Sequence, residues 1–306
     1  SQEKSNATSY DAMAFVIITL QSLAGLWING FIVSVLCVSW VKKKIFNSNE
    51  KILLFLESFR FGDLCISWVY SFTSMIFPHC YYVHPIPQIF AAILSFLDSA
   101  NVWVSACLCV FYCIKVANFQ HTFFIYLKVK LDRIVPWLLF GSVLLSLVMG
   151  TLGYDIMDRT IFKNINSTDT IILGTLRVRP DRHSFLMFLI SALISTTAFM
   201  VVIFSTVLLL FSLWRHKRRM HANSMRNLNM DAHIKVIKSI LFFIFIYSIN
   251  FIGSILISID ATKKQYLPIF FILIFQYALP FVHSLVLVFS NPKMEKTLLR
   301  TLSCFK

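Results

Sequence analysis

Seven separate runs of apolar residues divide the sequence, and each is long enough to cross a membrane. About 20 apolar residues span the hydrocarbon core of a bilayer when they form an α-helix. The runs cover residues 12–41, 51–77, 88–117, 133–153, 184–214, 234–260 and 266–290. The shortest connections between them are only a few residues, which forces neighbouring helices to be antiparallel. The sequence therefore predicts an all-α membrane protein, with residues 1–306 folded as one seven-transmembrane helix bundle.

The composition supports this class. The chain is 58% hydrophobic and 14% charged, whereas a soluble domain carries about 25% charged residues. The net charge of +14 sits in short clusters between the apolar runs, which is typical of membrane loops and predicts no nucleic-acid partner.

The distribution of positive charge predicts how the bundle is oriented. Of the 28 lysines and arginines, 18 lie at the junctions between the first and second, the third and fourth, and the fifth and sixth runs and after the last run, while 8 lie in the segments on the other side. The richer side is cytoplasmic by the positive-inside rule. We therefore expect a multi-pass plasma-membrane protein with an extracellular N-terminus and a cytoplasmic C-terminus.

Two glycosylation sequons fall on the predicted outer side. Asn6 begins one of them, and Asn166, which we expect in the middle of a loop, begins the other. Both are predicted to carry glycans.

The segment 291–306 predicts a short amphipathic helix. Met294, Leu298, Leu299 and Leu302 recur at helical spacing, with basic residues opposite. Such a helix lies on the inner leaflet, so membrane lipid or sterol is an expected partner. Cys304 in this tail is either a palmitoylation site or a free thiol.

Disulfides, metals and cofactors are not predicted. Of the seven cysteines only Cys80 falls near the predicted outer surface, so an extracellular disulfide framework cannot form. The spacing of cysteines and histidines matches no zinc site.

The second apolar run carries three charged residues on one face. Glu57, Arg60 and Asp63 are spaced three residues apart, so a cation lies between two carboxylates, and Asn29 of the first run is a possible hydrogen-bond partner. Two interpretations stay open: a structural polar staple, or a switch linked to a proton or ion.

Polar residues in the outer halves of three other runs are candidates for a pocket. If these faces converge, they line a polar pocket open to the outside; ordinary interhelical hydrogen bonding is the alternative. The candidates are Asp98, Asn101 and Ser105 in the third run, Tyr247, Asn250 and Ser254 in the sixth, and Gln276 and Tyr277 in the seventh.

The seventh run contains Pro280, which is expected to kink its helix and free a carbonyl group. His283 and Ser284 follow one turn later. The histidine is either a buried structural residue or a titrating switch. Because these two residues are adjacent, their side chains point in different directions on a helix. They do not form a catalytic pair, and an enzyme is not predicted.

The most specific pattern is the end of the third run. FYCIKVANF at 111–119, followed by FIYLKVK at 124–130, closely resembles the pattern FYxLKIANF and FxxLKxK of vertebrate bitter taste receptors, the type 2 taste receptors. Three further segments resemble the family's helices 1, 5 and 7. They contain Gly25 with Asn29-Gly30-Phe31-Ile32 and Trp40-Val41-Lys42, Ser212-Leu213 with His216 and Met220, and Pro280 with His283-Ser284, Leu287, Asn291 and Lys293.

The resemblance implies a G-protein-coupled receptor that binds small bitter compounds and signals through gustducin and related Gi proteins. The family's helix 2 arginine corresponds to Arg60, its helix 3 pocket positions to Leu94 and Asp98, and its helix 6 pocket tyrosine to Tyr247. Many mammalian members have Trp and Asn where this chain has Leu94 and Asp98, which suggests a divergent member. A desolvated carboxylate at Asp98 is predicted to favour agonists that carry an amine.

The predicted inner ends of the helices carry candidates for G-protein coupling. Tyr112, Lys115, His216 and Lys238 lie there, where each contacts the C-terminal helix of the G protein or holds the resting state. Which residue does which stays open. Arg60 and His283 are candidates for the switch between states.

Other seven-helix proteins are less consistent with the sequence. A type 1 vomeronasal receptor is the nearest alternative, and the segment 111–119 argues against it. A retinal protein needs a lysine in the last run, and residues 266–290 contain none. A transporter would be expected to show internal repeats, which the sequence lacks.

Overall fold

A computed structural model describes residues 2–43, 47–77, 83–116, 122–166, 182–222, 266–290 and 292–303, together with positions 242, 245, 246, 248, 249, 251 and 252. Within these ranges the chain forms helices and short connections without strands, which confirms the all-α class. The helices are α1 (Gln2–Lys43), α2 (Ser48–Ile76), α4 (Ile86–Val116), α5 (Thr122–Asn166), α6 (Arg182–Ala222), α8 (Tyr266–Ser290) and α9 (Pro292–Ser303).

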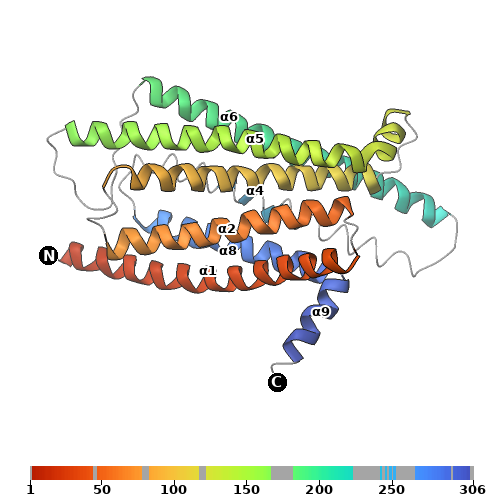
Figure 1. Ribbon diagram of the computed structural model, residues 1–306, viewed down its shortest axis with the longest axis horizontal. Coiled ribbons are helices and arrows are strands. Elements are labelled where there is room, and N and C mark those ends of the chain that lie inside the picture. Colours follow the sequence, from red (N-terminus) through yellow and green to blue (C-terminus); the bar gives the residue numbers. More distant parts are fainter. Residues whose placement is uncertain are drawn as a thin grey trace.

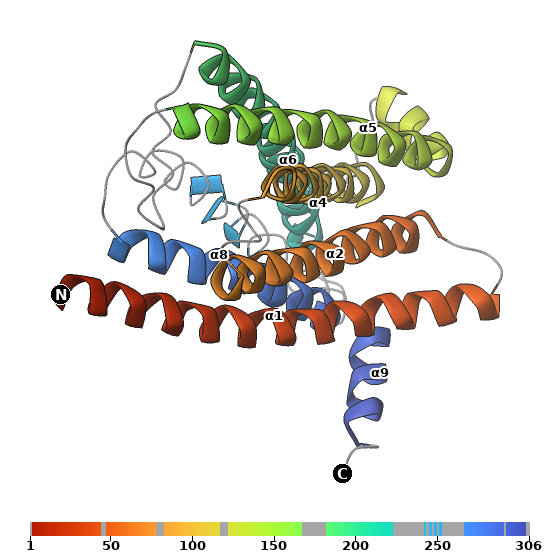
Figure 2. The ribbon, with the colours of Figure 1, turned by 60° about the vertical axis from the view of Figure 1, so that its left-hand side comes forward.

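The long helices lie side by side, with α4 in the middle (Figures 1 and 2). α4 packs against α2, α5 and α6, while α1 packs against α2 and α8. The N-terminus lies at one end of the bundle, and α9 turns away from the bundle beyond α1 (Figures 1 and 2).

Four of the described helices are long and apolar enough to cross a membrane. These stretches are Phe15–Lys42, Ile86–Lys115, Phe124–Arg159 and Leu189–Ser212. α2 has 29 residues, but Glu57, Arg60 and Asp63 near its middle lower its hydropathy. Most of the sixth predicted span, 234–260, lies outside the described residues.

Several helices run beyond the predicted spans, because helix formation does not stop where the apolar run ends. α1 begins ten residues before residue 12, so Asn6 is helical. α5 extends the predicted 133–153 in both directions and ends at Asn166. Asp155 and Arg159 form an ion pair at 2.9 Å one turn apart, which supports this extension. The expectation of Asn166 in the middle of a loop is therefore wrong, since it is the last residue of α5.

Local sequence sets where α2 begins. The side chain of Glu50 accepts a hydrogen bond from the backbone N–H of Asn47 at 3.3 Å, and Asn47 and Glu50 together form a capping box. Such a box satisfies backbone donors that a helix start leaves unpaired.

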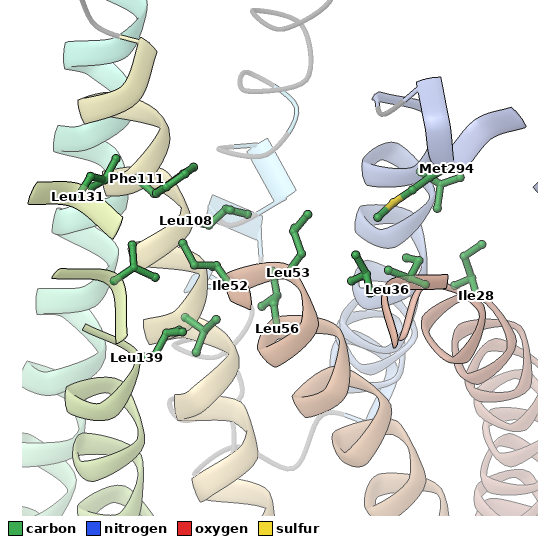
Figure 3. Packing of buried hydrophobic residues seen from close by; sticks show 14 of the residues in the cluster. Ile28, Leu36, Ile52, Leu53, Leu56, Leu108, Phe111, Leu131, Leu139 and Met294 are labelled. Atoms are coloured by element: carbon green, nitrogen blue, oxygen red, sulfur yellow. The ribbon is translucent and has the colours of Figure 1, made fainter. Parts of the chain in front are cut away.

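One buried apolar cluster joins α1, α2, α4, α5, α8 and α9 (Figure 3). Ile28 and Leu36 of α1 and Leu53 of α2 face Met294 of α9, and Phe111 of α4 faces Leu131 of α5 (Figure 3). Met294 and Leu298 are buried in this cluster, whereas Leu299 is exposed. The apolar side of α9 thus packs partly on the bundle rather than facing only lipid.

Close backbone contact fixes α4 against α5 farther along. A Cβ atom on Gly153 would lie 2.9 Å from the carbonyl oxygen of Ala91, and one on Gly150 would lie 3.1 Å from that of Ala92. Small residues allow membrane helices to approach this closely. The contact holds the part of α4 that carries Asp98.

Candidate functional site

A buried polar cluster connects α1, α2 and α8. Its members are Asn29, Glu57, Arg60, His283 and Ser284, and all five are buried. The guanidinium of Arg60 lies 3.0 Å from the carboxylate of Glu57 and also contacts Nδ1 of His283. A guanidinium only donates hydrogen bonds, so Nδ1 of His283 is the acceptor.

Ser284 closes the cluster on its other side. Its hydroxyl lies 2.9 Å from Oδ1 of Asn29 and 2.9 Å from Oε2 of Glu57, and it donates to one of these oxygens at a time. The amide of Asn29 in turn donates to the carbonyl of Gly25 at 2.6 Å. One cation and one anion are therefore paired within a set of hydrogen-bonded groups, an arrangement that favours the structural staple among the two interpretations of Glu57 and Arg60.

The adjacent residues His283 and Ser284 both reach this cluster, although they contact different partners. α8 remains helical through Pro280 from Tyr266 to Ser290. The cluster thus ties the last long helix to the first two.

A second group of charges lies one turn farther along α2. The half-buried Asp63 is within electrostatic range of Asp98 on α4 and of Arg60. Within the described part of the chain, neither Asp63 nor Asp98 forms a salt bridge. Among the described residues, Arg60 interacts with two carboxylates, those of Glu57 and Asp63. Asp63 on α2 and Asp98 on α4 lie near each other where these two helices pack together.

The carboxylate of Asp98 keeps accessible surface while protein atoms surround it. The side chain of Asp98 is exposed by its accessible area, and the packed atoms around it desolvate the carboxylate, as the sequence predicts. Exposure of this carboxylate to lipid would be costly, and its interaction with Asp63 places it toward α2. Asp98 therefore lies on the side of α4 that is turned toward α2.

The neighbours of Asp98 on α4 follow the predicted stripe. Leu94 and Asn101 are half-buried, and Ser105 is fully buried. The exposure of the side chains thus decreases along α4 from Asp98 through Asn101 to Ser105. The buried hydroxyl of Ser105 has no hydrogen-bond partner among the described residues.

Several predicted pocket and coupling residues fall outside the described part of the molecule. Gln276 and Tyr277 lie on α8, and His216 lies on α6, but their side chains are not described. The remaining four are Tyr247, Asn250, Ser254 and Lys238, whose positions lie outside the described residues.

The two candidates at the end of α4 have different surroundings. The hydroxyl of Tyr112 forms a hydrogen bond with the side chain of Asn49 at the start of α2, and its ring packs edge-on against Phe111 at 5.8 Å. The side chain of Lys115 is exposed, and its ammonium lies 5.1 Å from the centre of the Phe111 ring. Tyr112 is therefore fixed between helices, whereas Lys115 is accessible.

A cavity of about 160 Å³ opens beside Lys115 where α1, α2, α4 and α9 meet. Leu36, Leu53 and Met294 form part of its wall, and Asn49 and Glu50 add polar groups. Asn49 was not among the residues predicted from the sequence. The capping box of Asn47 and Glu50 could have indicated it, because the box fixes where α2 begins and therefore which way Asn49 points.

The described cysteines Cys37, Cys65, Cys107, Cys109 and Cys113 are free. Among the described residues, no group of three or more histidine, cysteine, aspartate or glutamate side chains is arranged to hold a metal ion.

Comparison with known proteins identifies the family. The family model described as "Taste receptor protein (TAS2R)" matches residues 7–306. The chain belongs to the taste receptor type 2 family. This match covers the polar cluster, Asp63, Asp98 and the end of α4 that carries Tyr112 and Lys115.

Relatives within this bitter taste receptor family are similar over nearly their whole length. Taste receptor type 2 member 8 of gorilla is 30% identical over 305 residues, covering 97% of each chain. Member 40 of chicken is 32% identical over 294 residues, covering 94% of each. Human member 9 is 28% identical over 304 residues, covering 97% of this chain and 96% of the relative.

Family membership confirms the resemblance found at residues 111–130 and in the three other segments. It excludes the type 1 vomeronasal receptor as the family of this chain. As a member of this family, the chain is a multi-pass plasma-membrane protein of the G-protein-coupled receptor class.

Proposed function

We propose that this chain is a bitter taste receptor that binds small bitter compounds in a pocket beside Asp98 and activates a gustducin or Gi-type G protein. The observation that carries the proposal is the exposed carboxylate of Asp98, which lies within electrostatic range of Asp63 in a bundle of this family. The absence of a described salt-bridge partner leaves both carboxylates available to a cationic ligand.

The electrostatics favour an agonist that carries an amine. Arg60 is already paired with Glu57 at 3.0 Å, so it cannot neutralise Asp63 and Asp98 fully. A ligand ammonium beside Asp98 gains an ion pair in surroundings of low dielectric constant, where a charged hydrogen bond is stronger than a neutral one. Leu94, a smaller residue than the Trp of many mammalian members, leaves space for the apolar part of such a ligand.

The pocket in this proposal includes residues of other helices. Asn101 supplies a polar group from α4, while Gln276 of the seventh span and Tyr247, Asn250 and Ser254 of the sixth complete it. In this proposal the N-terminus lies outside the cell and the C-terminus inside, so the pocket opens to the outside. Glycans on Asn6 and Asn166 fit this orientation, and α9 lies at the inner leaflet in contact with lipid or sterol.

The coupling end lies at the opposite end of α4. The hydrogen bond between Tyr112 and Asn49 supports a role for Tyr112 in holding the resting state. The exposure of Lys115 supports a role in contacting the G protein, together with His216 and Lys238. Agonist binding shifts the bundle toward a state in which Tyr112 leaves Asn49 and the inner ends separate. In this scheme Arg60 and His283 hold α2 and α8 together in both states.

Expression of the full chain with a chimeric G protein tests the proposal. Cells are challenged with a panel of bitter compounds that includes amines and uncharged molecules, and surface expression is measured in parallel. We expect a calcium response to at least one amine. Silence toward the whole panel, despite receptor at the cell surface, would contradict the proposal.

A further inference from the structure

Three polar side chains converge where the chain enters α4, at the end of the bundle near the N-terminus (Figure 1). Nε2 of His84 lies 3.5 Å from Oδ1 of Asp158 on α5. The amide nitrogen of Gln88, in the first turn of α4, donates to the same Oδ1 at 3.1 Å. The group lies well apart from Asp98 and from the polar cluster.

Gln88 contains a buried oxygen without a partner. The residue is only 1% exposed, and its Oε1 makes no hydrogen bond. An orphaned buried acceptor is costly and calls for an explanation such as an ion. Rotation of the amide by half a turn would exchange its nitrogen and oxygen and break the present hydrogen bond to Asp158. The amide oxygen would then lie beside the carboxylate, and a cation between the two oxygens would replace that hydrogen bond.

The spacing of these groups matches that of metal ligands. Zinc binds imidazole nitrogen at about 2.0–2.1 Å in tetrahedral geometry, which separates neighbouring ligand atoms by about 3.4 Å. The observed 3.5 Å between His84 and Asp158 is close to this separation. The side chains of His84 and Asp158 are 65% and 44% exposed, so an ion can enter and water can complete its coordination.

The ligand set also indicates which metals fit. An imidazole nitrogen with carboxylate and amide oxygens suits zinc, nickel or copper, whereas magnesium and calcium prefer oxygen ligands alone. We propose that His84, Gln88 and Asp158 bind a divalent transition-metal ion such as Zn²⁺, which links the start of α4 to α5.

A metal ion at this site would strengthen the contact between α4 and α5. The glycine contact already holds α4 and α5 close together, and the ion adds a bridge at the end of that contact. Binding therefore stabilises the folded bundle, because the ion binds the native arrangement and not the unfolded chain.

The test uses the full chain purified in lipid nanodiscs and titrated with zinc chloride. Thermal unfolding and competition with a fluorescent zinc chelator are measured for the wild type and for His84→Ala, an exposed position that folding tolerates. Asp155→Asn is the matched control, since this carboxylate lies on α5 one turn away and pairs with Arg159. Gln88→Leu tests the third ligand.

We expect zinc to raise the unfolding temperature of the wild type and of Asp155→Asn. We also expect His84→Ala and Gln88→Leu to weaken zinc binding by about tenfold or more. Magnesium chloride should have no comparable effect. Equal zinc affinity in the wild type and His84→Ala would overturn the proposal, as would a wild type that zinc does not stabilise.

Discussion

Two groups of charged residues lie one turn apart on α2, and they differ in how completely their charges are matched. In the polar cluster, Arg60 pairs with Glu57 at 3.0 Å, and Ser284 and Asn29 supply further hydrogen bonds. One turn later, Asp63 faces Asp98 of α4, and the described residues supply neither with a salt bridge. A buried charge with all its partners holds helices together, whereas an unmatched charge in an accessible space is available to a ligand.

The largest loss of stability should come from removing Arg60, the cation of the polar cluster. Arg60→Ala leaves Glu57 buried without its partner, which costs about 3–5 kcal/mol. We expect little folded receptor at the cell surface and a strongly lowered unfolding temperature. Arg159→Ala is the control, because its ion pair with Asp155 is partly exposed and contributes only about 0–1 kcal/mol. Equal unfolding temperatures of Arg60→Ala and Arg159→Ala would show that the polar cluster does not hold the helices together.

A double variant should recover much of that loss. Replacing Arg60 by Met and Glu57 by Leu together leaves neither charge unpaired, and such apolar replacements of buried pairs are often neutral or stabilising. The double variant should therefore unfold at a higher temperature than either single variant. If the two losses simply add, the pair is not coupled and the account of the cluster is wrong.

Removing a charge from the pair of Asp63 and Asp98 should change the stability of the bundle in the opposite direction. Asp63→Asn removes a like-charge repulsion with Asp98, so we expect unchanged or higher stability, by about 1 kcal/mol or less. Glu57→Gln, the equivalent change in the polar cluster, should lower the unfolding temperature. A loss of stability in Asp63→Asn as large as that of Glu57→Gln would remove the distinction between the two groups.

The smallest effect is expected for a neutral member of the cluster. Ser284→Ala removes one hydrogen bond between helices, and such bonds contribute about 0.6 kcal/mol on average in membrane proteins. Thermal unfolding in nanodiscs should show a small decrease. A decrease as large as that of Arg60→Ala would mean that the Ser284 hydroxyl contributes as much to the contact between α8 and α2 as Arg60 does.

Sequence alone predicted the contacts that lie within one helix. The three-residue spacing of Glu57 and Arg60 placed them on one face, and the ion pair formed as expected. A buried structural role was one of the two interpretations of His283, but the helices that His283 and Ser284 contact depend on how α8 rotates against α1 and α2. The spacing of residues within one helix does not determine how that helix is rotated against its neighbours.

The carboxylate pair and the coupling end were less predictable for a related reason. Asp98 was identified from its place in an apolar run, yet its proximity to Asp63 depends on the packing of α2 against α4. Tyr112 and Lys115 are three residues apart and could not be distinguished by sequence. The difference arises because the start of α2 places Asn49 beside Tyr112 and leaves Lys115 exposed.

The ends of the helices were also poorly predicted from apolar runs. Hydropathy reports which residues lie in hydrocarbon, whereas capping and ion pairs such as Asp155 with Arg159 decide where a helix stops. For this reason α5 extends to Asn166, far beyond the predicted end at residue 153.

The central claim is that Asp98 binds a cationic agonist, and one measurement tests it directly. Agonist potency is determined for the wild type and Asp98→Asn, each with an amine agonist and with an uncharged molecule of the same shape. Asp98→Asn should weaken the amine by about 10- to 100-fold, the size of a charged hydrogen bond, and leave the uncharged molecule nearly unchanged. Equal losses for both molecules, or none for the amine, would contradict the account.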